Sequence, residues 1–408
     1  MEAIILAGGL GTRLRSVVPD LPKCMARVFN RPFLEYLLDN LIKGGVKKVV
    51  FSVGYKSDLI QNHFKESYKS CEIVYAKEKK LLGTGGAIRN SLRFVNGEQV
   101  IVVNGDSLLL SNIKEQLAFH KLINADVTFA LKPLKNPSRY GTVEIDDNNR
   151  VLKFNEKQLL DFGLINAGCY IFNTKKFQEY KFPEKFSIEN DFFQNEVDNL
   201  NFYGFKTNGF FLDIGIPVDF KKAQLEVGVM PYIDSSWTLF LDRDGVINKR
   251  IIGDYVRDVS QFQFIDGAVD AINYFSKIFR RIIVVTNQQG IGKGLYKEED
   301  LSNIHNEMRK TIEEKGGRID AVYYAPQLKE ENSLMRKPMP GMAHSAKNDF
   351  PKIDFNKSIM IGDSISDMEF AVNAGIIPVY LNDSNNDSNW YKTKSLIGFS
   401  KLMESILN

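Results

Sequence analysis

The chain has 408 residues, which at about 100–200 residues per domain favours two domains or three. Apolar residues make up 44% and charged residues 25%, the balance of an ordinary globular protein, which excludes long disordered, collagen-like and fibrous classes. The 53 Lys and Arg residues against 50 Asp and Glu residues leave a net charge of +3, too balanced for an electrostatic binder of nucleic acid.

Membrane and secretion signals are the next features to consider. No run reaches about 18 uncharged apolar residues, so we expect no membrane span and no membrane partner. The amino terminus carries an acid, Glu2, and lacks the basic region of a signal peptide. Cys24, Cys71 and Cys169 are too far apart, and odd in number, for a disulfide scaffold or a metal knuckle. We therefore expect a reducing, cytoplasmic location and cysteines that serve only in packing.

Short apolar runs rich in β-branched residues alternate with amphipathic stretches of helix length in the first half. The predicted strands are Ala3–Leu6, Lys48–Val53, Val100–Asn104, Val127–Leu131 and Ala167–Phe172. The predicted helices are Phe33–Lys43 and Ser111–Ile123, and the helix-like stretches that hold His63 and His120 are polar enough for both rings to face solvent. This alternation predicts an α/β fold with a largely parallel sheet.

The same pattern starts again after a short break at residues 230–236. New strands are predicted at Trp237–Leu241, Ile282–Thr286 and Ser358–Ile361. We place the boundary near residue 232 and predict domains 1–230 and 236–408, each a mainly parallel sheet flanked by helices. The segment Asn382–Lys394, rich in Asn, Asp and Ser, is expected to be a surface loop.

A glycine-rich loop follows the first strand. Gly8, Gly9 and Gly11 leave no Cβ in the way of a phosphate group. Arg13 and Lys23 would add positive charge beside it. Taken alone, the loop is equally compatible with a tight strand-to-helix turn. A Rossmann fingerprint is excluded because its third glycine is missing, and a P-loop is excluded because Gly-Lys-Ser/Thr occurs nowhere.

The loop becomes specific in combination with later motifs. Gly8-Gly9-x-Gly11-Thr12-Arg13-Leu14, followed by Leu21-Pro22-Lys23, resembles the signature of sugar-1-phosphate nucleotidyltransferases, and the resemblance covers about residues 1–228. Further pieces follow in the order of the family: Leu82–Ala87, Asn104–Asp106, Arg139–Gly141, Phe154–Lys157, Asn166–Gly168 and Leu212–Gly215. The chain departs from the family at Cys24-Met25, where many relatives read Pro-Leu, but the lysine before it is retained.

This resemblance implies a Rossmann-like fold and transfer of a nucleotidyl group from a nucleoside triphosphate to a sugar phosphate. Arg13 and Lys23 would contact the triphosphate as catalytic residues, and Asp106 and Asp213 would hold Mg²⁺. The implied nucleotide-binding residues are Leu6, Ala7, Gly8, Gly9, Gly11, Thr12, Arg13, Lys23, Gly83, Thr84, Gly85 and Asp106. The implied sugar-phosphate residues are Tyr140, Gly141, Glu156, Lys157 and Asn166. Taken singly, a turn aspartate at 106, a helix-capping aspartate at 213 and a solvated lysine at 157 are the less favoured alternatives, and the ordered set of motifs disfavours them further.

A second acidic motif, Asp242-Arg243-Asp244-Gly245, ends the strand predicted at Trp237–Leu241. Residues i and i+2 of an extended chain face the same side, so the carboxylates of Asp242 and Asp244 can converge on one cavity. A hairpin with acidic residues is the alternative. Three later motifs support the chemical interpretation: Thr286-Asn287-Gln288, Arg336-Lys337-Pro338-Met339-Pro340-Gly341 and Gly362-Asp363-Ser364-Ile365-Ser366-Asp367.

An aspartate, a hydroxyl, a lysine and an acidic pair in this order resemble the four motifs of haloacid-dehalogenase-type phosphatases, over about residues 236–382. The resemblance implies that Asp242 attacks phosphorus and that Asp244 protonates the leaving oxygen and then activates water. Mg²⁺, which removes the repulsion between two anions, would be held by Asp242, the backbone carbonyl of Asp244, and Asp363. The other implied roles are phosphoryl contacts by Thr286 and Lys337, substrate contacts by Asn287, Gln288 and Arg336, and support of Lys337 or the metal by Asp367.

Two further expectations for the second half concern a structural zinc site and a cap domain. Many relatives of the second half carry a zinc loop of three cysteines and a histidine, but the stretch from Tyr323 to Met335 contains neither residue type. His305 and His344 are too isolated to replace it, so no zinc is expected. The short connection between the second acidic motif and the Thr286 motif predicts little or no cap domain.

Within these families, the second half is most similar to heptose-bisphosphate 7-phosphatases, with histidinol-phosphate phosphatases as cousins, and the first half to heptose-1-phosphate guanylyltransferases. Together they imply two successive steps toward GDP-heptose with GTP, heptose phosphates and Mg²⁺, no nucleic acid, and a homo-oligomer as a compatible state. The alternative is a hexose-1-phosphate nucleotidyltransferase fused to a less specific sugar-phosphate or histidinol-phosphate-like phosphatase. A non-catalytic sensor is disfavoured because Asp106, Asp213, Asp242 and Asp363 are all present.

Overall fold

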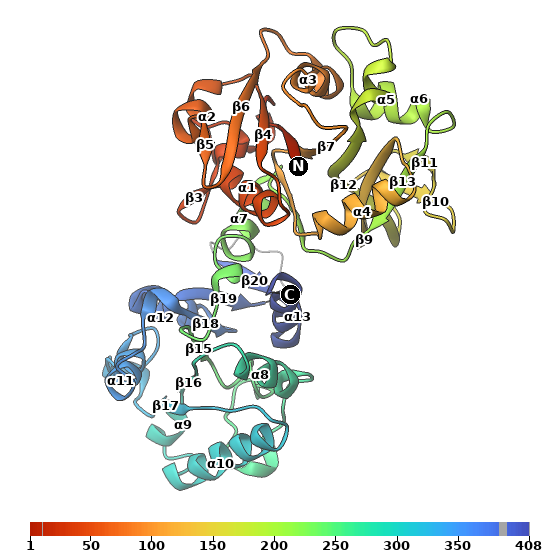
Figure 1. The fold of residues 1–408 in the computed structure, drawn as a ribbon. Helices are drawn as coiled ribbons and strands as arrows, with labels where there is room; N and C mark the ends of the chain where they lie inside the picture. Colours follow the sequence, from red (N-terminus) through yellow and green to blue (C-terminus); the bar gives the residue numbers. More distant parts are fainter. Residues whose placement is uncertain (10, 383–389, 408) are drawn as a thin grey trace. The chain divides into compact units, whose positions relative to one another are not determined.

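The computed structural model describes residues 1–9, 11–382 and 390–407, and it divides into two compact units, Met1–Gly228 and Val229–Asn408. Each unit contains a large sheet with helices packed against it, so the predicted α/β class is confirmed (Figure 1). Within the described residues, no helix is long and apolar enough to cross a membrane.

The first unit is organised around a ten-stranded sheet whose centre is parallel, in the order β7-β1-β4-β6. Strand β12 adds antiparallel pairings to β7, β9 and β10. The strands of this sheet are β1 (Glu2–Leu6), β4 (Lys48–Val53), β5 (Ser67–Tyr68), β6 (Cys71–Lys77), β7 (Gln99–Asn104), β9 (Val127–Lys135), β10 (Thr142–Ile145), β11 (Val151–Asn155), β12 (Phe162–Asn173) and β13 (Phe202–Lys206).

The helices of the first unit follow the apolar periodicity of the sequence. Helix α1 has the predicted bounds because Phe33, Leu34, Leu37, Leu38 and Leu41 form one buried stripe at helical spacing. The helices are α1 (Phe33–Lys43), α2 (Ser57–Phe64), α3 (Gly83–Leu92), α4 (Ile113–Leu122), α5 (Thr174–Glu179), α6 (Gln194–Glu196) and α7 (Pro217–Glu226), with short turns η1 (Thr12–Leu14) and η2 (Lys23–Met25) and a π-helix η3 (Ile188–Phe193). Two short ribbons pair β2 (Arg27–Val28) with β3 (Arg31–Pro32) and β8 (Ser107–Leu109) with β14 (Phe211–Asp213).

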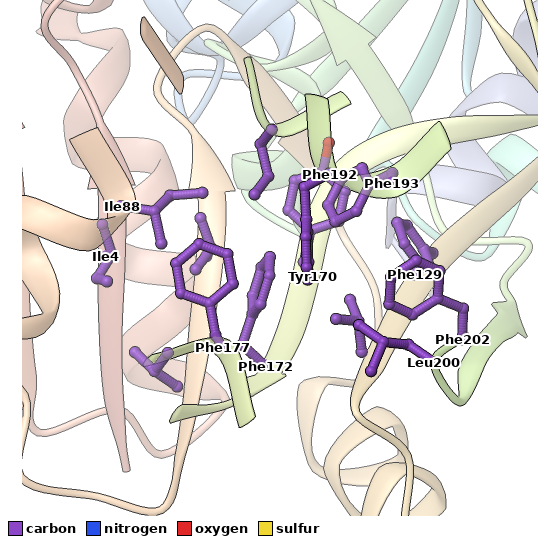
Figure 2. Packing of buried hydrophobic residues seen from close by; sticks show 14 of the residues in the cluster. Ile4, Ile88, Phe129, Tyr170, Phe172, Phe177, Phe192, Phe193, Leu200 and Phe202 are labelled. Atoms are coloured by element: carbon purple, nitrogen blue, oxygen red, sulfur yellow. The ribbon is translucent and has the colours of Figure 1, made fainter. Parts of the chain in front are cut away.

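An aromatic cluster fills the space between β9, β12 and η3 (Figure 2). Phe193 is 1% exposed, and its ring lies 4.6 Å from that of Phe129 and 5.3 Å from that of Tyr170, measured between centroids. Such tilted and edge-on pairs add to the free energy gained by burying the rings. The cluster fixes η3 against the sheet.

The Phe193→Ala variant should lower the free energy of unfolding of the first unit by about 3–5 kcal/mol, because it leaves a cavity among packed rings. Urea denaturation monitored by near-ultraviolet circular dichroism measures this. Phe94→Ala is the control, since Phe94 is 39% exposed and should cost far less. Equal losses in the two variants would contradict the assignment of Phe193 to the core.

The second unit contains one six-stranded sheet among its described residues, entirely parallel, in the order β17-β16-β15-β18-β19-β20. Figure 1 shows α11 and α12 on one side of this sheet and α8 and α13 on the other. The strands are β15 (Thr238–Leu241), β16 (Arg281–Asn287), β17 (Ala321–Ala325), β18 (Ser358–Gly362), β19 (Ile377–Leu381) and β20 (Tyr391–Thr393). The helices are α8 (Ala268–Ser276), α9 (Gln289–Gly292), α10 (Glu298–Glu314), α11 (Gly341–Asp349), α12 (Ile365–Ala374) and α13 (Leu396–Leu407), with short turns η4 (Met230–Tyr232), η5 (Val259–Gln261), η6 (Lys329–Glu331) and η7 (Phe355–Lys357).

Two expectations about the chain need correction. Residues Tyr391–Thr393 form the edge strand β20 rather than a loop, while residues 383–389 of the predicted loop lie outside the described part. His120 is 2% exposed rather than solvated, and its Nδ1 lies 2.8 Å from the hydroxyl of Thr128 on β9. Burial lowers the pKa of His120 to about 4, so the ring is neutral and belongs to the core.

Candidate active sites

A cavity of about 400 Å³ lies at the carboxyl ends of β1, β4 and β7, beside the start of α3. Ligands of open α/β sheets bind at this edge because the loops after the strands meet there. Most of the predicted nucleotide-binding residues line the cavity: Leu6, Ala7, Gly8, Gly9, Gly11, Arg13, Lys23, Gly83, Thr84 and Asp106. The side chain of Thr12, also predicted, lies outside the described part of the chain.

Lys23 lies between the two predicted metal-binding carboxylates. Its Nζ is 2.5 Å from Asp106 Oδ2 and 3.6 Å from Asp213 Oδ1. The β8–β14 ribbon brings the acids together by pairing Asp213 with Ser107. Gly11 has a φ of +57°, and a Cβ there would lie 2.9 Å from Lys23 Cβ, so glycine allows the loop to fit against the lysine.

The charges around Lys23 suit a divalent cation. Burial, and then the charge of Asp106, raise the pKa of Asp213 because two carboxylates share a partly dry space. Oxygen atoms of this kind are the ligands that Mg²⁺ prefers. The residues present therefore fit a magnesium ion held by Asp106 and Asp213.

One residue predicted to contact the nucleotide does not line the cavity, and an acidic residue that was not predicted does. Gly85 is buried and does not line the cavity, because its N–H donates to Phe186 O and a Cβ would collide with the Phe186 ring. Glu78, which no motif indicated, does line it. Its carboxylate accepts hydrogen bonds from the Leu82 N–H at 3.1 Å and the Ser52 hydroxyl at 3.2 Å. An acid between a strand and the Gly83 turn was the available signal.

The predicted sugar-phosphate residues gather at a different part of the sheet. Strand pairing places Thr142 opposite Asn155 and opposite Ile165. Gly141 and Asn166 therefore meet, and the Asn166 N–H donates to Gly141 O at 3.5 Å. Glu156 and Lys157 directly follow β11, and Tyr140 packs against Phe211 on β14, with 5.6 Å between ring centroids. None of them lines the 400 Å³ cavity. Glu189 on the π-helix η3 was missed by sequence reasoning. Burial raises its pKa, the charge of Lys157 opposes this, and the charge of Asp106 adds to it, so Glu189 lies within electrostatic range of both predicted regions.

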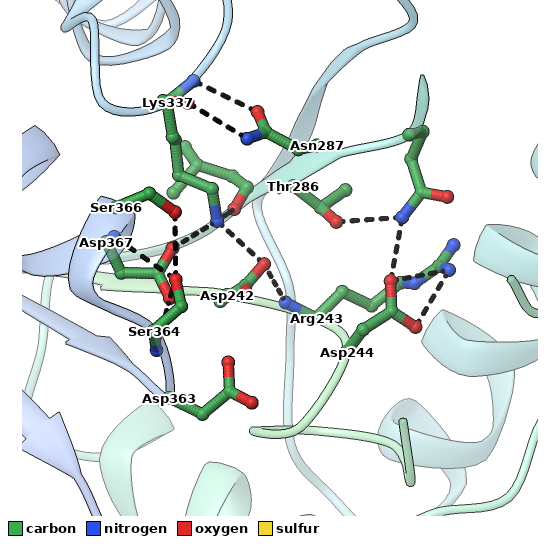
Figure 3. A network of polar contacts seen from close by, with 12 residues as sticks. Asp242, Arg243, Asp244, Thr286, Asn287, Lys337, Asp363, Ser364, Ser366 and Asp367 are labelled. Atoms are coloured by element: carbon green, nitrogen blue, oxygen red, sulfur yellow. Dashed lines mark hydrogen bonds and ion pairs between the residues drawn. The ribbon is translucent and has the colours of Figure 1, made fainter. Parts of the chain in front are cut away.

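Figure 3 shows the second site, where Lys337 lies among three acceptors. Its Nζ is 2.8 Å from Asp242 Oδ1, 2.6 Å from Asp367 Oδ1 and 2.9 Å from Val285 O. All these groups are nearly or fully buried. Burial alone would lower the pKa of Lys337, but Asp242 and Asp367 reverse this and raise it. The structure therefore places Asp367 as the partner of Lys337.

Asp363 completes an acidic cluster beside Asp242. Carboxylate oxygens of Asp242, Asp363 and Asp367 all lie within 4.8 Å of one another. Gly245 has a φ of +89°, and a Cβ there would collide with the carboxylate of Asp363, so glycine is needed at the turn. Burial and the charge of Asp367 raise the pKa of Asp363 to about 6 and also raise that of Asp242. These raised values fit a divalent cation, which would stabilise both anions.

Asp244 points away from Asp363, toward a set of donors (Figure 3). Arg243 Nη2 donates to both of its oxygens at 3.0 and 2.9 Å, Asn248 Nδ2 donates at 2.9 Å, and Gln288 Nε2 at 2.8 Å. Burial by itself would raise the pKa of Asp244, but the charge of Arg243 and these hydrogen bonds outweigh it and lower the pKa. The carboxylate of Asp244 is therefore favoured in its ionised form.

The remaining predicted residues divide between cavity and support. Asp242, Asp244, Thr286, Asn287, Arg336, Lys337 and Asp363 line a cavity of about 290 Å³. Gln288, predicted as a substrate contact, does not line this cavity: the residue is 0% exposed and donates to Asp244 and to Thr286. Asn287 uses its amide to hold the backbone of Lys337 at 3.1 and 3.0 Å.

Several polar residues of this cavity were not predicted, among them Gln289 and Arg250. Gln289 lines it and accepts a hydrogen bond from Arg336 at 3.1 Å. Arg250 lines it as well, with Nη1 3.7 Å from Asp363 Oδ2. Gln289 continues the Thr286-Asn287-Gln288 motif, whereas Arg250 lies outside the motifs and only its proximity in the fold identifies it.

Comparison with known proteins agrees with the division into two sites. Residues 2–228 match the family model described as nucleotidyl transferase, and residues 239–380 match the one described as polynucleotide kinase 3 phosphatase. D-glycero-alpha-D-manno-heptose 1-phosphate guanylyltransferase of Aneurinibacillus thermoaerophilus is 47% identical over 56% of this chain and 98% of its own length.

Two solved structures are also similar. HddC from Yersinia pseudotuberculosis, crystallised with GMP-PN, is 34% identical with a TM-score of 0.50, over 55% of this chain and 99% of its own. A D,D-heptose 1,7-bisphosphate phosphatase from B. bronchiseptica, crystallised with magnesium and phosphate, is 24% identical with a TM-score of 0.38, over 41% of this chain and 98% of its own. From the family model, which spans more than half of the sequence, the chain belongs to the nucleotidyl transferase family.

Proposed function

We propose that the chain is a bifunctional enzyme of nucleotide-activated heptose synthesis. Its second unit would remove the 7-phosphate of D-glycero-D-manno-heptose 1,7-bisphosphate, and its first unit would transfer GMP from GTP to the resulting heptose 1-phosphate. The observation that carries the proposal is the gathering of aspartates and a lysine at a separate cavity in each unit. The 47% identical guanylyltransferase supports the choice of nucleotide and sugar for the first.

In the first unit the protein has to neutralise charge and hold two phosphates in line. Arg13 and Lys23 would bind the triphosphate, with the glycine loop close to its oxygens. Asp106 and Asp213 would hold Mg²⁺, which supplies charge neutralisation at the reacting phosphate. Lys157 would bind the sugar phosphate from the other part of the sheet, together with Tyr140, Glu156 and Asn166.

The guanine preference has a candidate contact in Glu78. Guanine presents two adjacent donors, N1–H and the 2-amino group, on its pairing edge. An ionised carboxylate only accepts hydrogen bonds, and its two oxygens suit such a pair. Glu78 lines the cavity and is held by Leu82 and Ser52. Adenine, with one donor beside a ring acceptor, would fit this carboxylate less well.

In the second unit Asp242 would attack phosphorus and form an aspartyl-phosphate, which water then hydrolyses. Lys337 and Thr286 would hold the phosphoryl oxygens. Asp244 would give a proton to the departing sugar oxygen and later take one from water. Asp242 and Asp363, with the Asp244 carbonyl, would hold Mg²⁺, which supplies charge neutralisation between the carboxylate and the phosphate. We propose no zinc for this unit and a cytoplasmic location; a homo-oligomer remains compatible with the proposal.

The experiment is incubation of the pure chain with heptose 1,7-bisphosphate, GTP and MgCl₂. The expected result is release of inorganic phosphate and pyrophosphate with formation of GDP-heptose, and loss of both activities in excess EDTA. ATP, CTP and UTP in parallel, and hexose 1-phosphates as acceptors, test the base and the sugar. No phosphate release and no GDP-heptose would contradict the proposal. Activity confined to a hexose 1-phosphate or to another nucleoside triphosphate would show that the proposed sugar or base is wrong.

A further inference from the structure

Arg243 stands between the two acids of the Asp-x-Asp motif and is fully buried. Its exposed fraction is 0%, and it is among the largest of the fully buried side chains of the described residues. The backbone N–H donates to Asp242 Oδ1 at 2.7 Å, while Nη2 of the side chain donates to both oxygens of Asp244. A buried guanidinium is costly unless its donors are paired, so its partners fix where it can lie.

The other end of this guanidinium is held by His305 of α10. Arg243 Nη1 lies 3.2 Å from His305 Nε2, and the histidine is 8% exposed. Arginine has no acceptor, so Nε2 must present its lone pair and the ring proton must be on Nδ1. Burial, and then the charge of Arg243, lower the pKa of His305 to about 3, which agrees with a neutral ring.

We propose that His305 is a positioning residue of the phosphatase reaction, which fixes the guanidinium plane of Arg243 and through it the carboxylate of Asp244. The inference rests on the proposed phosphatase function of the second unit. Arg243 Nε has no hydrogen-bond partner among the described residues, so the group is held only through Nη1 and Nη2. Removing the acceptor at Nη1 frees the guanidinium to turn about its own axis, and Asp244 loses its bidentate anchor.

The consequence falls on proton transfer rather than on binding. Asp244 has to reach the departing sugar oxygen, and such transfer depends steeply on distance and angle. Asn248 and Gln288 would still donate to Asp244, so the carboxylate keeps these two hydrogen bonds but is less well oriented. Among the described residues, neither Lys337 nor Thr286 forms a hydrogen bond with His305, so both would still hold the phosphoryl group.

The surroundings of His305 allow a direct test by chemical rescue. The ring forms part of the wall of a cavity of about 220 Å³, which is also lined by Ser302, Asn306, Arg309 and Tyr324. Truncation of His305 to alanine would enlarge this cavity by the volume of an imidazole ring. Added imidazole could therefore occupy the vacated place and accept from Arg243 again.

The experiment compares His305→Ala, His305→Gln and the control His344→Ala in the full chain; His344 is exposed on α11 and contacts Phe355. Single-turnover phosphoryl transfer is measured with two substrates. The sugar oxygen of heptose 1,7-bisphosphate is a poor leaving group that needs a proton, whereas the p-nitrophenolate of p-nitrophenyl phosphate leaves without one. His305→Ala should slow transfer from the sugar phosphate by on the order of 10²-fold and from p-nitrophenyl phosphate only slightly. The His305→Gln variant keeps a hydrogen-bond acceptor and should retain more activity than His305→Ala. Added imidazole should accelerate His305→Ala but not the other variants.

Equal slowing with both leaving groups, or no slowing, would overturn the proposal, as would slowing without rescue by imidazole. Hydrolysis of p-nitrophenyl phosphate near the wild-type rate in the same samples reports that the second unit, which carries His305, is folded. If His305→Ala does not fold, Arg243→Lys decides: it keeps a charge but cannot bridge Asp244 and His305, so it should discriminate between the leaving groups in the same way. A wild-type chain that hydrolyses neither substrate would instead contradict the proposed function itself.

Discussion

The Asp242→Asn variant should lose phosphatase turnover by on the order of 10⁴-fold or more, because an amide cannot act as the attacking oxygen anion. The protein surrounding this carboxylate is arranged for an anion: Lys337 lies 2.8 Å away and the Arg243 N–H 2.7 Å away. Guanylyl transfer by the same preparation should be unchanged, since the residues of that cavity belong to the first unit. Phosphate release and GDP-heptose formation, measured separately, give the two rates.

The control for this variant is Asp270→Asn, which alters an exposed acid on α8 in the same unit. It should leave both activities near wild type. Substantial phosphatase activity in Asp242→Asn would show that another group attacks phosphorus. Loss of guanylyl transfer in a folded Asp242→Asn protein would show that the two reactions share a site.

The Asp106→Ala variant should have the reverse effect. Removing this carboxylate removes a proposed metal ligand and leaves Lys23 with Asp213 alone, so guanylyl transfer should fall by at least about 10²–10³-fold, the range for loss of one preorganised electrostatic contact. Phosphate release from heptose 1,7-bisphosphate should not change. Pyrophosphate release with GTP and heptose 1-phosphate is the measurement.

Asp147→Ala serves as the matched control, because Asp147 is exposed in the turn between β10 and β11. Raised MgCl₂ should restore part of the Asp106→Ala activity if the lost group binds the ion. Wild-type transfer rates in Asp106→Ala at all MgCl₂ concentrations would remove Asp106 from the proposed mechanism.

The positions of the aspartates proposed to be catalytic or metal-binding could be predicted because they follow buried strands. Apolar runs such as Lys48–Val53 and Ser358–Ile361 have few alternatives to a central parallel strand, and the structure confirms both. The carboxyl ends of such strands lie at one edge of the sheet, which brings Asp106 to the first cavity and Asp242 and Asp363 to the second.

Other residues could not be placed from their motifs. Thr286, Asn287 and Gln288 are adjacent in sequence, yet Gln288 turns inward to Asp244 while Gln289 faces the cavity. A motif locates a loop but does not determine which way each side chain points. His120 and His305 were also beyond prediction, because their polar partners, Thr128 and Arg243, come from other elements of the fold.

The most direct test of two independent phosphorus-handling sites in one chain is complementation between the single-site variants. Asp242→Asn alone and Asp106→Ala alone should each fail to convert heptose 1,7-bisphosphate and GTP into GDP-heptose. A mixture of the two proteins should form it, because heptose 1-phosphate released by one diffuses to the other. ³¹P NMR follows the bisphosphate, the free phosphate and GDP-heptose in one sample. A mixture of two folded variants that makes no GDP-heptose would contradict the account.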